Sequence, residues 1–336
     1  MGSNSNQKIL LSHGSGGRLT HALIKDVFLK ELGANQHNCL DDAAEIAIKA
    51  GKKLAFTTDS YVVKPLFFPG GDIGRLAVCG TVNDLAMKGA QPMAMSASFI
   101  IEEGFRMEAL RRIISSMKRA CKEADCRIVT GDTKVVEKGA ADKLFITTSG
   151  IGVIPNGVDI SGKNARTGDV ILINGPIAQH GTAVLNARED LGFSGNLRSD
   201  VRPLNKSVGS MLRATKNIHV LRDLTRGGLA TALNEISQAS GLGILINEIS
   251  VPIDKAARAV CSLLGLDPLY VANEGKFIAI MPKKHANKLI KTRLKGTGFK
   301  LIGELQLNPK SVRIKTSIGG ERILLMMEGE QLPRIC

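Results

Sequence analysis

Strand-forming and helix-forming segments are mixed in both halves of this chain, and this mixture limits the possible folds more than any other feature. In the first half, a β-rich segment at 54–63 precedes apolar residues at helical spacing over 73–88 and 107–124. Further segments typical of strands lie at 127–129, 144–153, 170–173, 243–247 and 277–281, and further helical segments at 180–189, 203–215, 228–240 and 254–264. Because these segments do not follow a strict strand–helix–strand alternation, the sequence predicts an α+β fold.

The chain of 336 residues is long enough for about two domains of roughly 150 residues each. Pro155-Asn156-Gly157 marks the link between them. We therefore expect domains at 8–155 and 156–309. From 310 to 336 the chain has only short β-like pieces, which predicts a loosely held tail. Residues 1–7 are set aside as an expression remnant.

The net charge of +14 is compatible with an anionic partner, but Lys and Arg are spread along the chain without a long basic run. The chain has no Trp and only 2 Tyr, which argues against aromatic platforms for single-stranded nucleic acid. We expect no nucleic-acid partner. No segment has the length and apolar character of a signal peptide or a membrane span.

The 6 cysteines do not form CxxC pairs, so neither a zinc site nor a disulfide framework is expected. Reduced thiols favour a cytoplasmic protein. One of these cysteines, Cys336, is the final residue. A terminal thiol is unhindered and can reach a partner, although an incidental terminal Cys is the alternative interpretation.

Acidic residues beside small residues recur along the chain, while the GxxxxGK[ST] phosphate loop, the HExxH motif and the GxGxxG motif are all absent. The acidic clusters are Asp41-Asp42-Ala43-Ala44, Thr57-Thr58-Asp59, Asn83-Asp84, Gly131-Asp132-Thr133-Lys134 and 223–228. Magnesium prefers hard oxygen ligands, and a nucleotide triphosphate supplies only part of its shell. Each acid taken alone is more typical of a turn or a helix cap than of a metal ligand.

Taken together and in this order, the motifs resemble those of the PurM-like ATP-binding superfamily. They are Ser12-His13-Gly14-Ser15-Gly16-Gly17, Asp41-Asp42-Ala43-Ala44, Thr58-Asp59, 83–90, 223–228 and Asn273-Glu274-Gly275. The resemblance implies a homodimer of two-domain α+β subunits with ATP and Mg²⁺ near the face between the N-terminal domains. It also implies that the strand at 56–63 and its neighbours pair across a two-fold axis into a shared barrel.

Two segments are more specific. The run 129–136 and the ending Pro333-Arg334-Ile335-Cys336 resemble the HypE family of hydrogenase maturation factors, and this resemblance extends from about residue 8 to the end. It implies an ATP-dependent carbamoyl dehydratase. The resemblance further implies that a carbamoyltransferase, HypF, loads Cys336 with a carbamoyl group as a thiocarboxamide. It implies that the enzyme then dehydrates this group to a thiocyanate, which supplies cyanide to iron of NiFe hydrogenase through a HypC–HypD complex.

The resemblance also assigns roles to individual residues. Asp42, Asp59, Asp84 and Asp223 are implied as Mg²⁺–ATP ligands, and Cys336, Glu274 and Lys134 as the catalytic group, with Glu274 the base and Lys134 its orienter or proton relay. The remaining residues implied in nucleotide binding are His13, Gly14, Gly16, Gly17, Asn83, Asp132, Thr133, Arg226 and Gly227. For His13, an ordinary surface-loop histidine is the alternative.

Two other functions stay open. The chain has the features of another PurM-like phosphotransferase, such as a thiamine-phosphate kinase, in which Cys336 would have no role. Selenophosphate synthetase is a poorer match, because Ser15-Gly16-Gly17-Arg18 lacks the Cys or selenocysteine of that enzyme's glycine loop. A basic scaffold without catalysis is the third possibility, and Mg²⁺-dependent stabilisation by ATP distinguishes it from an enzyme.

Overall fold

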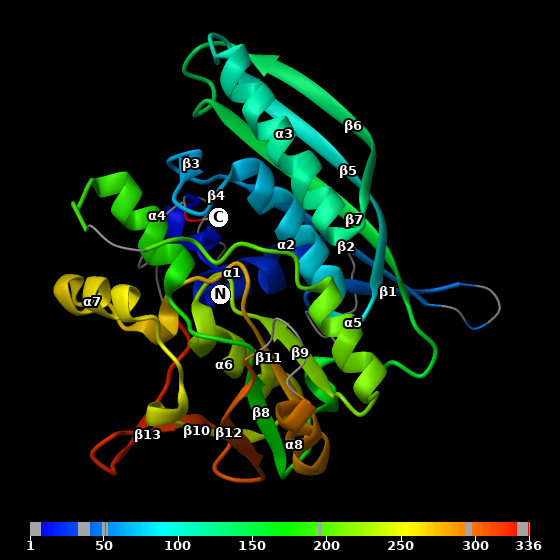
Figure 1. The fold of residues 1–336 in the computed structure, drawn as a ribbon, viewed down its shortest axis with the longest axis vertical. Coiled ribbons are helices and arrows are strands. Elements are labelled where there is room, and N and C mark those ends of the chain that lie inside the picture. Colours follow the sequence, from blue (N-terminus) through cyan, green and yellow to red (C-terminus); the bar gives the residue numbers. More distant parts are fainter. Residues whose placement is uncertain are drawn as a thin grey trace.

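The computed structural model describes residues 8–32, 41–48, 51, 53–193, 197–292, 298–327 and 335. Each half of the chain builds one β-sheet, and helices cover and separate the two sheets (Figure 1). Residues 1–7 and Cys336 lie outside the described residues, so the structure does not address the assignments made for them. No helix in the described part has the length and apolar character needed to span a membrane.

The first sheet has the strand order β1-β2-β7-β5-β6. Its strands are β1 (Ala44–Ala47), β2 (Lys53–Tyr61), β5 (Gln91–Glu102), β6 (Arg127–Val136) and β7 (Leu144–Ile154). Helix α2 (Ile73–Met87) is buried on nearly every side, because most of its residues are apolar or small. Helix α3 (Met107–Ala124) buries only one stripe, since basic residues alternate with its apolar ones. A short hairpin, β3 (Phe67–Phe68) and β4 (Gly71–Asp72), leads into α2.

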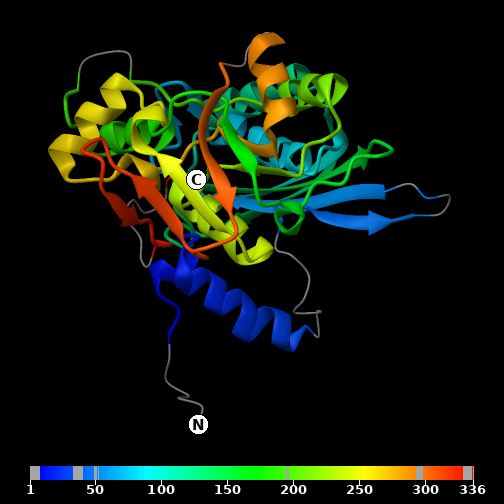
Figure 2. The ribbon, with the colours of Figure 1, turned by 90° about the horizontal axis from the view of Figure 1, so that it is seen from below.

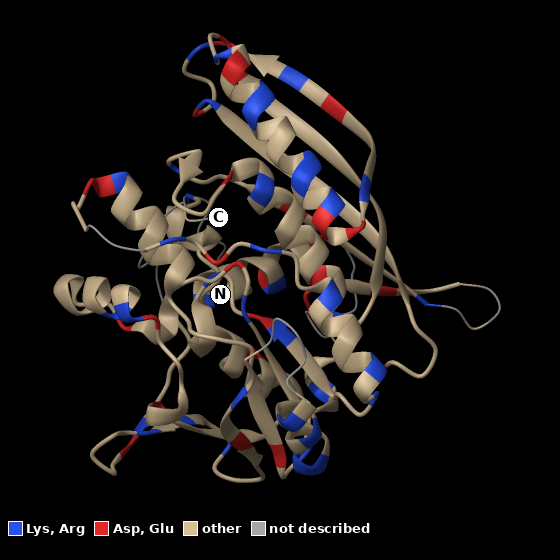
Figure 3. Ribbon diagram, in the orientation of Figure 1, with Lys and Arg blue, Asp and Glu red and all other residues tan. Residues whose placement is uncertain are grey.

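The second sheet has the order β14-β13-β10-β12-β8-β11-β9. Its strands are β8 (Asp169–Ile173), β9 (Val220–Asp223), β10 (Gly243–Asn247), β11 (Phe277–Pro282), β12 (Lys300–Gln306), β13 (Val312–Lys315) and β14 (Glu321–Ile323). The helices of this half are α4 (Gln179–Glu189), α5 (Asn205–Ala214), α6 (Gly228–Ser240), α7 (Lys255–Leu264) and α8 (Lys283–Thr292). Lys and Arg lie on helices and strands of both halves, so no single basic face stands out in Figure 3.

An apolar core joins the two halves. Leu85 and Met87 at the end of α2 belong to the same buried cluster as Leu172 of β8 and Phe277 of β11. Burying such side chains contributes about 1.5–3 kcal/mol each relative to exposure. The halves are therefore packed as one body, with α2 lying between them.

The chain before the first sheet forms η1 (Leu11–Gly14) and a helix that runs through α1 (Arg18–Leu23) and η2 (Ile24–Leu29). Figure 2 shows this helix beside the body rather than inside it. The backbone N–H of Arg18 donates to the carbonyl of Met327 at 2.9 Å. A side chain at Gly17 would place its Cβ 2.2 Å from the same carbonyl oxygen, so glycine is required for this close approach.

The structure differs from the predicted elements in several places, and β1, β9 and β12 are among the strands that were not predicted. β5 was not predicted and lies at the centre of the first sheet between β7 and β6, and β6 continues to Val136 rather than ending at 129. β13 pairs with β10, and β14 pairs with β13. The segment 312–323, expected to be part of a loosely held tail, is thus an edge of the second sheet, held by ladder hydrogen bonds.

Candidate nucleotide site

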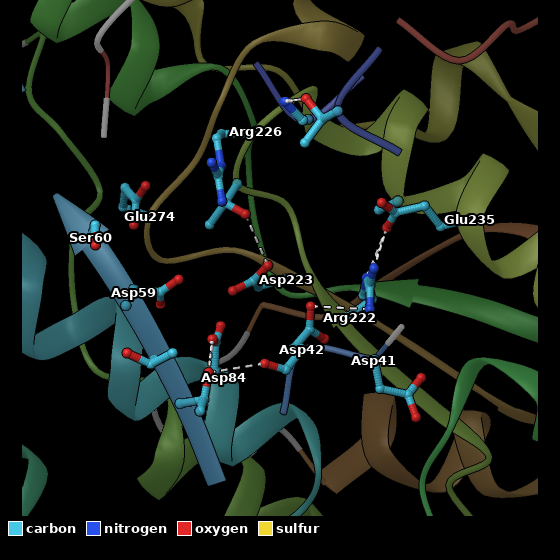
Figure 4. Close-up of a pocket in the computed structure, with 18 of the residues that line it drawn as sticks. Asp41, Asp42, Asp59, Ser60, Asp84, Arg222, Asp223, Arg226, Glu235 and Glu274 are labelled. Carbon is cyan, nitrogen blue, oxygen red and sulfur yellow. Dashed lines mark hydrogen bonds and ion pairs between the residues drawn. The ribbon is translucent and has the colours of Figure 1, made fainter. Parts of the chain in front are cut away.

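A cavity of about 400 Å³ lies where β2, α2, β9 and the N-terminal helix meet. Five acidic side chains that the sequence singled out line it: Asp42, Asp59, Asp84, Asp223 and Glu274. Figure 4 shows their carboxyl groups around one shared space, although they come from distant parts of the sequence. Gly16, Thr57, Arg222, Arg226 and Glu235 are among the other lining residues.

The alternation of β2 explains how two of these groups meet. Thr57, Asp59 and Tyr61 are alternate residues of β2, so their side chains point to one face of the strand, towards α2. The Thr57 hydroxyl donates to Asp84 Oδ2 at 2.7 Å, and the Tyr61 hydroxyl donates to Asp59 Oδ2 at 3.1 Å. Strand β2 and helix α2 thus hold two carboxylates against the same wall of the cavity.

Asp223 ends β9, where a glycine turn leads into α6. Gly227 has φ +75°, and a Cβ there would lie 2.0 Å from Thr231 Oγ1, so only glycine fits. The turn places Arg226 beside the N-terminal loop, where its guanidinium donates to the carbonyl of Gly14 at 3.3 Å. A Cβ at Gly16 would lie 2.7 Å from Cβ of Arg226, so this loop rests directly on the turn at the edge of the cavity.

An arginine whose side chain is only 13% exposed links the acids on the opposite side. Arg222 Nη1 lies 3.2 Å from Asp42 Oδ1, and the same guanidinium pairs with Glu235. His21 of the N-terminal helix approaches Glu235 Oε1 with its Nε2 at 2.9 Å. The N-terminal helix is therefore tied to the cavity wall by a chain of charged groups.

Burial of so many acids changes their protonation. Burial raises the pKa of Asp84 well above its usual value, and the neighbouring Asp59 charge adds to the shift. The pKa of Asp42 is also raised by burial, although Arg222 opposes the shift. Burial raises the pKa of Asp223 to about 6, again against the influence of Arg222. The cavity thus favours a cation that would balance these carboxylates.

The donor set fits magnesium in its chemistry, since carboxylate oxygens are hard ligands. Yet among the described residues no three Asp, Glu, His or Cys side chains are gathered closely enough to hold a metal ion by themselves. Magnesium commonly binds through one or two carboxylates, with substrate phosphates and water completing the shell. The cavity matches that mode better than an all-protein metal site.

Comparison with known proteins identifies the family. Residues 40–154 match the family described as "AIR synthase related protein, N-terminal domain". Residues 166–314 match the family described as "AIR synthase related protein, C-terminal domain". Carbamoyl dehydratase HypE of Cupriavidus necator is 47% identical over 333 residues, which are 98% of this chain and 95% of the relative. This chain belongs to the HypE family.

Solved structures of the HypE family agree with this assignment. A structure described as a HypE–HypF complex contains a chain 46% identical, with a TM-score of 0.84, covering 91% of this chain and all of that one. A HypE structure in complex with ATP is 47% identical with a TM-score of 0.81 and covers 98% of this chain and 100% of that chain. The predicted PurM-like, two-domain α+β fold is confirmed.

Several residues that the HypE resemblance assigned to the nucleotide lie elsewhere in the described chain. Asn83 is 2% exposed, and its amide donates to the carbonyls of Arg202 and Glu274 while accepting from Leu204 N. It therefore joins backbone segments and does not line the cavity. His13 lies in η1, where its ring accepts from the backbone N–H of Leu10 at 3.0 Å.

The three assigned residues of β6 are also separate from the acidic cavity of their own subunit. Lys134 and Asp132 form an exposed ion pair of 3.0 Å on this edge strand. Asp132 and Thr133 line a different hollow, between β6 and α3. The assignment of these residues to ATP and catalysis stays a prediction.

The cavity also includes charged residues that the sequence did not reveal, namely Arg222, Glu235 and His21. Glu235 lies in α6 and Arg222 in β9, so only the tertiary fold makes them neighbours. Two sequence features could have indicated a role for Arg222. It directly precedes Asp223, and a charged residue inside a buried strand needs a partner of opposite charge.

Replacing Arg222 with Met should destabilise the protein strongly. The substitution leaves Asp42 and Glu235, whose side chains are 11% and 19% exposed, without their cation, a change that costs up to about 3–5 kcal/mol for a fully buried pair. Arg106→Met is the matched control, because the Arg106–Glu108 pair has side chains 80% and 82% exposed. Thermal unfolding should show a large fall in Tm for Arg222→Met and almost none for the control. Equal Tm values would contradict a structural role for Arg222.

Proposed function

We propose that this protein is an ATP-dependent carbamoyl dehydratase that acts on its own last residue, Cys336. The carbamoyl group is carried on the cysteine sulfur as a thiocarboxamide, and the product is a thiocyanate that supplies cyanide for the iron of NiFe hydrogenase. The observation that carries this proposal is the buried acidic cavity in a chain that matches the HypE family over nearly its whole length. A HypE relative whose structure contains ATP supports the nucleotide as co-substrate.

In this proposal, the Mg²⁺ that accompanies ATP is held by one or two carboxylates from the set Asp42, Asp59, Asp84 and Asp223, and ATP phosphates and water complete its shell. The metal supplies charge neutralisation for the transferring phosphoryl group. Arg226 lines the cavity beside the loop that contains Gly14 and Gly16, and a guanidinium at this position is suited to phosphate. Gly14 and Gly16, both implied by the family resemblance, thus belong to a loop that approaches the edge of the cavity.

The chemistry explains the need for ATP. An amide oxygen is a very poor leaving group, so the terminal phosphoryl group is transferred to the carbamoyl oxygen, giving ADP. The C–O bond then breaks, phosphate departs with that oxygen, and the nitrogen loses both protons as the C≡N bond forms on the Cys336 sulfur. The net change is loss of one water from the thiocarboxamide, coupled to hydrolysis of ATP to ADP and phosphate.

Glu274 is proposed as the base that takes a proton from this nitrogen. It is 3% exposed and lines the cavity, and its backbone is fixed by hydrogen bonds to Asp200. Burial raises the pKa of Glu274 well above its usual value, and the nearby Asp223 charge acts in the same direction. A carboxylate with a raised pKa is a stronger base at neutral pH, as a general base requires.

Nucleotide binding should depend on pH in a defined direction. Because the pKa of Asp223 is raised to about 6, its carboxyl group carries a proton below that pH and must lose it to bind metal. The rise in Tm produced by ATP with Mg²⁺ should therefore be larger at about pH 7.5 than at about pH 5.5. ATP with EDTA is the control. A Tm rise that is equal at both pH values, or unchanged by EDTA, would contradict the metal site.

We also propose that the protein is a homodimer formed through the first sheet. Helices α2 and α3 cover one face of this sheet. Large apolar side chains remain exposed on its strands, among them Phe56, Met93, Ile100, Val135 and Ile151. An apolar sheet surface of this kind favours burial against a second copy. The assignment of Lys134 as partner of Glu274 depends on such pairing, because Lys134 is not at the cavity of its own subunit.

Light scattering at micromolar concentration should give the mass of a dimer for the wild type. Phe56 is 39% exposed and directly opposite Ile151 across β2 and β7, so Phe56→Glu should weaken the dimer by placing a charge in the apolar interface. Ile318→Glu, on the exposed turn after β13, should leave the mass unchanged. A wild-type monomer would count against the shared barrel.

Partners follow from the same function. The HypE–HypF complex among the similar structures supports HypF as the enzyme that loads Cys336. Delivery of cyanide to a HypC–HypD complex, and a cytoplasmic location, are further parts of the proposal. The competing phosphotransferase function predicts that Cys336→Ala remains active on a free small substrate, whereas the dehydratase does not.

A further inference from the structure

Ile335, next to the last residue of the chain, lies inside the fold. Ile335 is only 5% exposed and belongs to an apolar cluster that joins Phe68 of the first half with Val184 and Val201 of the second. An isoleucine side chain in such surroundings contributes favourable burial. Ile335 therefore occupies an apolar site formed by this cluster, which we call the seat of the tail.

A buried histidine contacts the backbone of this residue. His180 is 0% exposed, and its Nε2 lies 3.0 Å from the carbonyl oxygen of Ile335. A carbonyl can only accept, so Nε2 carries the proton and donates. The other ring nitrogen, Nδ1, lies 2.8 Å from Ser199 Oγ. Burial lowers the pKa of His180, which agrees with a neutral ring that donates at one nitrogen and accepts at the other.

The orientation of His180 is fixed from several sides. Ser199 Oγ accepts from Val201 N at 3.1 Å, so its own hydroxyl proton is available to His180 Nδ1. Ser199 N donates to Pro69 O at 2.8 Å, and a Cβ at Gly70 would lie 2.6 Å from Ser199 O. The ring of Phe68 meets the imidazole edge-on with centroids 5.4 Å apart. The donor is thus preorganised towards the tail.

Ser199 and Asp200, which are adjacent in the chain, contact His180 and the proposed base Glu274, respectively. Asp200, the residue after Ser199, accepts from the backbone N–H groups of Glu274 and Gly275, each at 3.1 Å. A Cβ at Gly275 would lie 2.0 Å from Asp200 O, so the two segments are in direct contact. Lys276 pairs with Asp200 at 3.3 Å, with both side chains nearly fully buried. A continuous set of contacts therefore leads from Ile335 to Glu274.

We propose that His180 is a positioning residue for the tail: with Ser199 behind it, it holds the carbonyl of Ile335 and fixes the point from which Cys336 continues. This inference rests on the proposed function, since Cys336 is there the carrier of the reacting group. His180 touches neither ATP nor the carbamoyl carbon in this account. Its effect is to raise the fraction of molecules whose tail is seated beside the segment that carries Glu274.

Two substitutions separate the hydrogen bond from the volume of the ring. His180→Leu fills the space without a donor, whereas His180→Gln keeps an N–H donor of similar reach. The first readout is the rate at which a thiol reagent labels Cys336, followed in the C-terminal peptide by mass spectrometry. The second is the single-turnover rate of dehydration of carbamoyl-loaded protein, measured together with ATP affinity.

We expect His180→Leu to label Cys336 about tenfold faster and to dehydrate about tenfold more slowly, because a buried carbonyl loses its donor. His180→Gln should recover most of both rates, and ATP affinity should match the wild type in both variants. The labelling rate does not require catalysis, so it tests the seat even if the wild type proves not to be a dehydratase.

A His180→Leu variant with wild-type labelling would overturn the proposal, as would one with faster labelling but a normal dehydration rate. If thermal unfolding shows that His180→Leu does not fold, Ser199→Ala takes its place. That variant keeps the imidazole and removes the hydroxyl that contacts His180 Nδ1 and Val201 N, so smaller changes in the same directions are expected. Unchanged rates for Ser199→Ala in that case would equally overturn the proposal.

Discussion

Asp84→Asn is expected to lose ATP turnover by about 100-fold or more while the fold survives. Asp84 lines the wall of the acidic cavity, within hydrogen-bond distance of Thr57 and close enough to Asp59 to share charge repulsion with it. Its neutral form is already favoured by burial, so an amide of the same shape should not destabilise the buried site. The loss should therefore appear in phosphate release and not in Tm.

Asp190→Asn serves as the control for this experiment. Asp190 is exposed at the end of α4 in the left-handed region, with φ 47°, a conformation that Asn adopts readily. Its substitution should leave both phosphate release and Tm unchanged. An Asp84→Asn protein with the wild-type rate would remove the central role of the carboxylates.

Removal of Cys336 should abolish dehydration completely and leave ATP binding intact. The carboxylates that line the cavity come from β2, α2, β9 and neighbouring loops, none of which depends on the last residue. Without the sulfur there is no atom to carry the carbamoyl group. The measurement pairs a nucleotide titration with detection of thiocyanate or cyanide after incubation with ATP and the carbamoylating partner.

Cys261→Ser is the control, because it removes a thiol elsewhere in the chain. Among the described cysteines, Cys79, Cys121, Cys126 and Cys261 are all buried and free. Burial raises the pKa of Cys261 to about 11, so this thiol is a poor nucleophile at neutral pH. The control should produce thiocyanate normally. Product from a chain that lacks Cys336 would rule out the tethered mechanism.

The parts of the fold that follow from local pattern could be predicted from the sequence. Helix α3 shows a clear apolar stripe, and α6 is bounded by glycines in the left-handed region, so their bounds agree with the sequence expectation. Strand β5 was not predicted, because Met, Ala and Ser alternate there in place of the usual β-branched residues. Its position between β6 and β7 is a property of long-range pairing that no local pattern contains.

In the acidic site, too, some features could be predicted from the sequence and others depend on the tertiary fold. Asp42, Asp59, Asp84 and Asp223 could be predicted as one group only through the family resemblance, and the structure brings all four to one cavity. Asn83 directly precedes Asp84 but points to the backbone of the second half, because successive helical residues face different directions. Arg222 and Glu235 could not be predicted to pair, since they meet only when α6 packs near β9.

The most direct test is the mass of the C-terminal peptide that contains Cys336. The protein is loaded by the carbamoylating partner, freed of it, and then given ATP with Mg²⁺. The account predicts that loading adds one carbamoyl group to this peptide, and that ATP then removes the mass of one water without releasing the carbon. The loss should require hydrolysable ATP. A loaded peptide whose mass stays constant with ATP, or one that loses the whole carbamoyl group, would contradict the account.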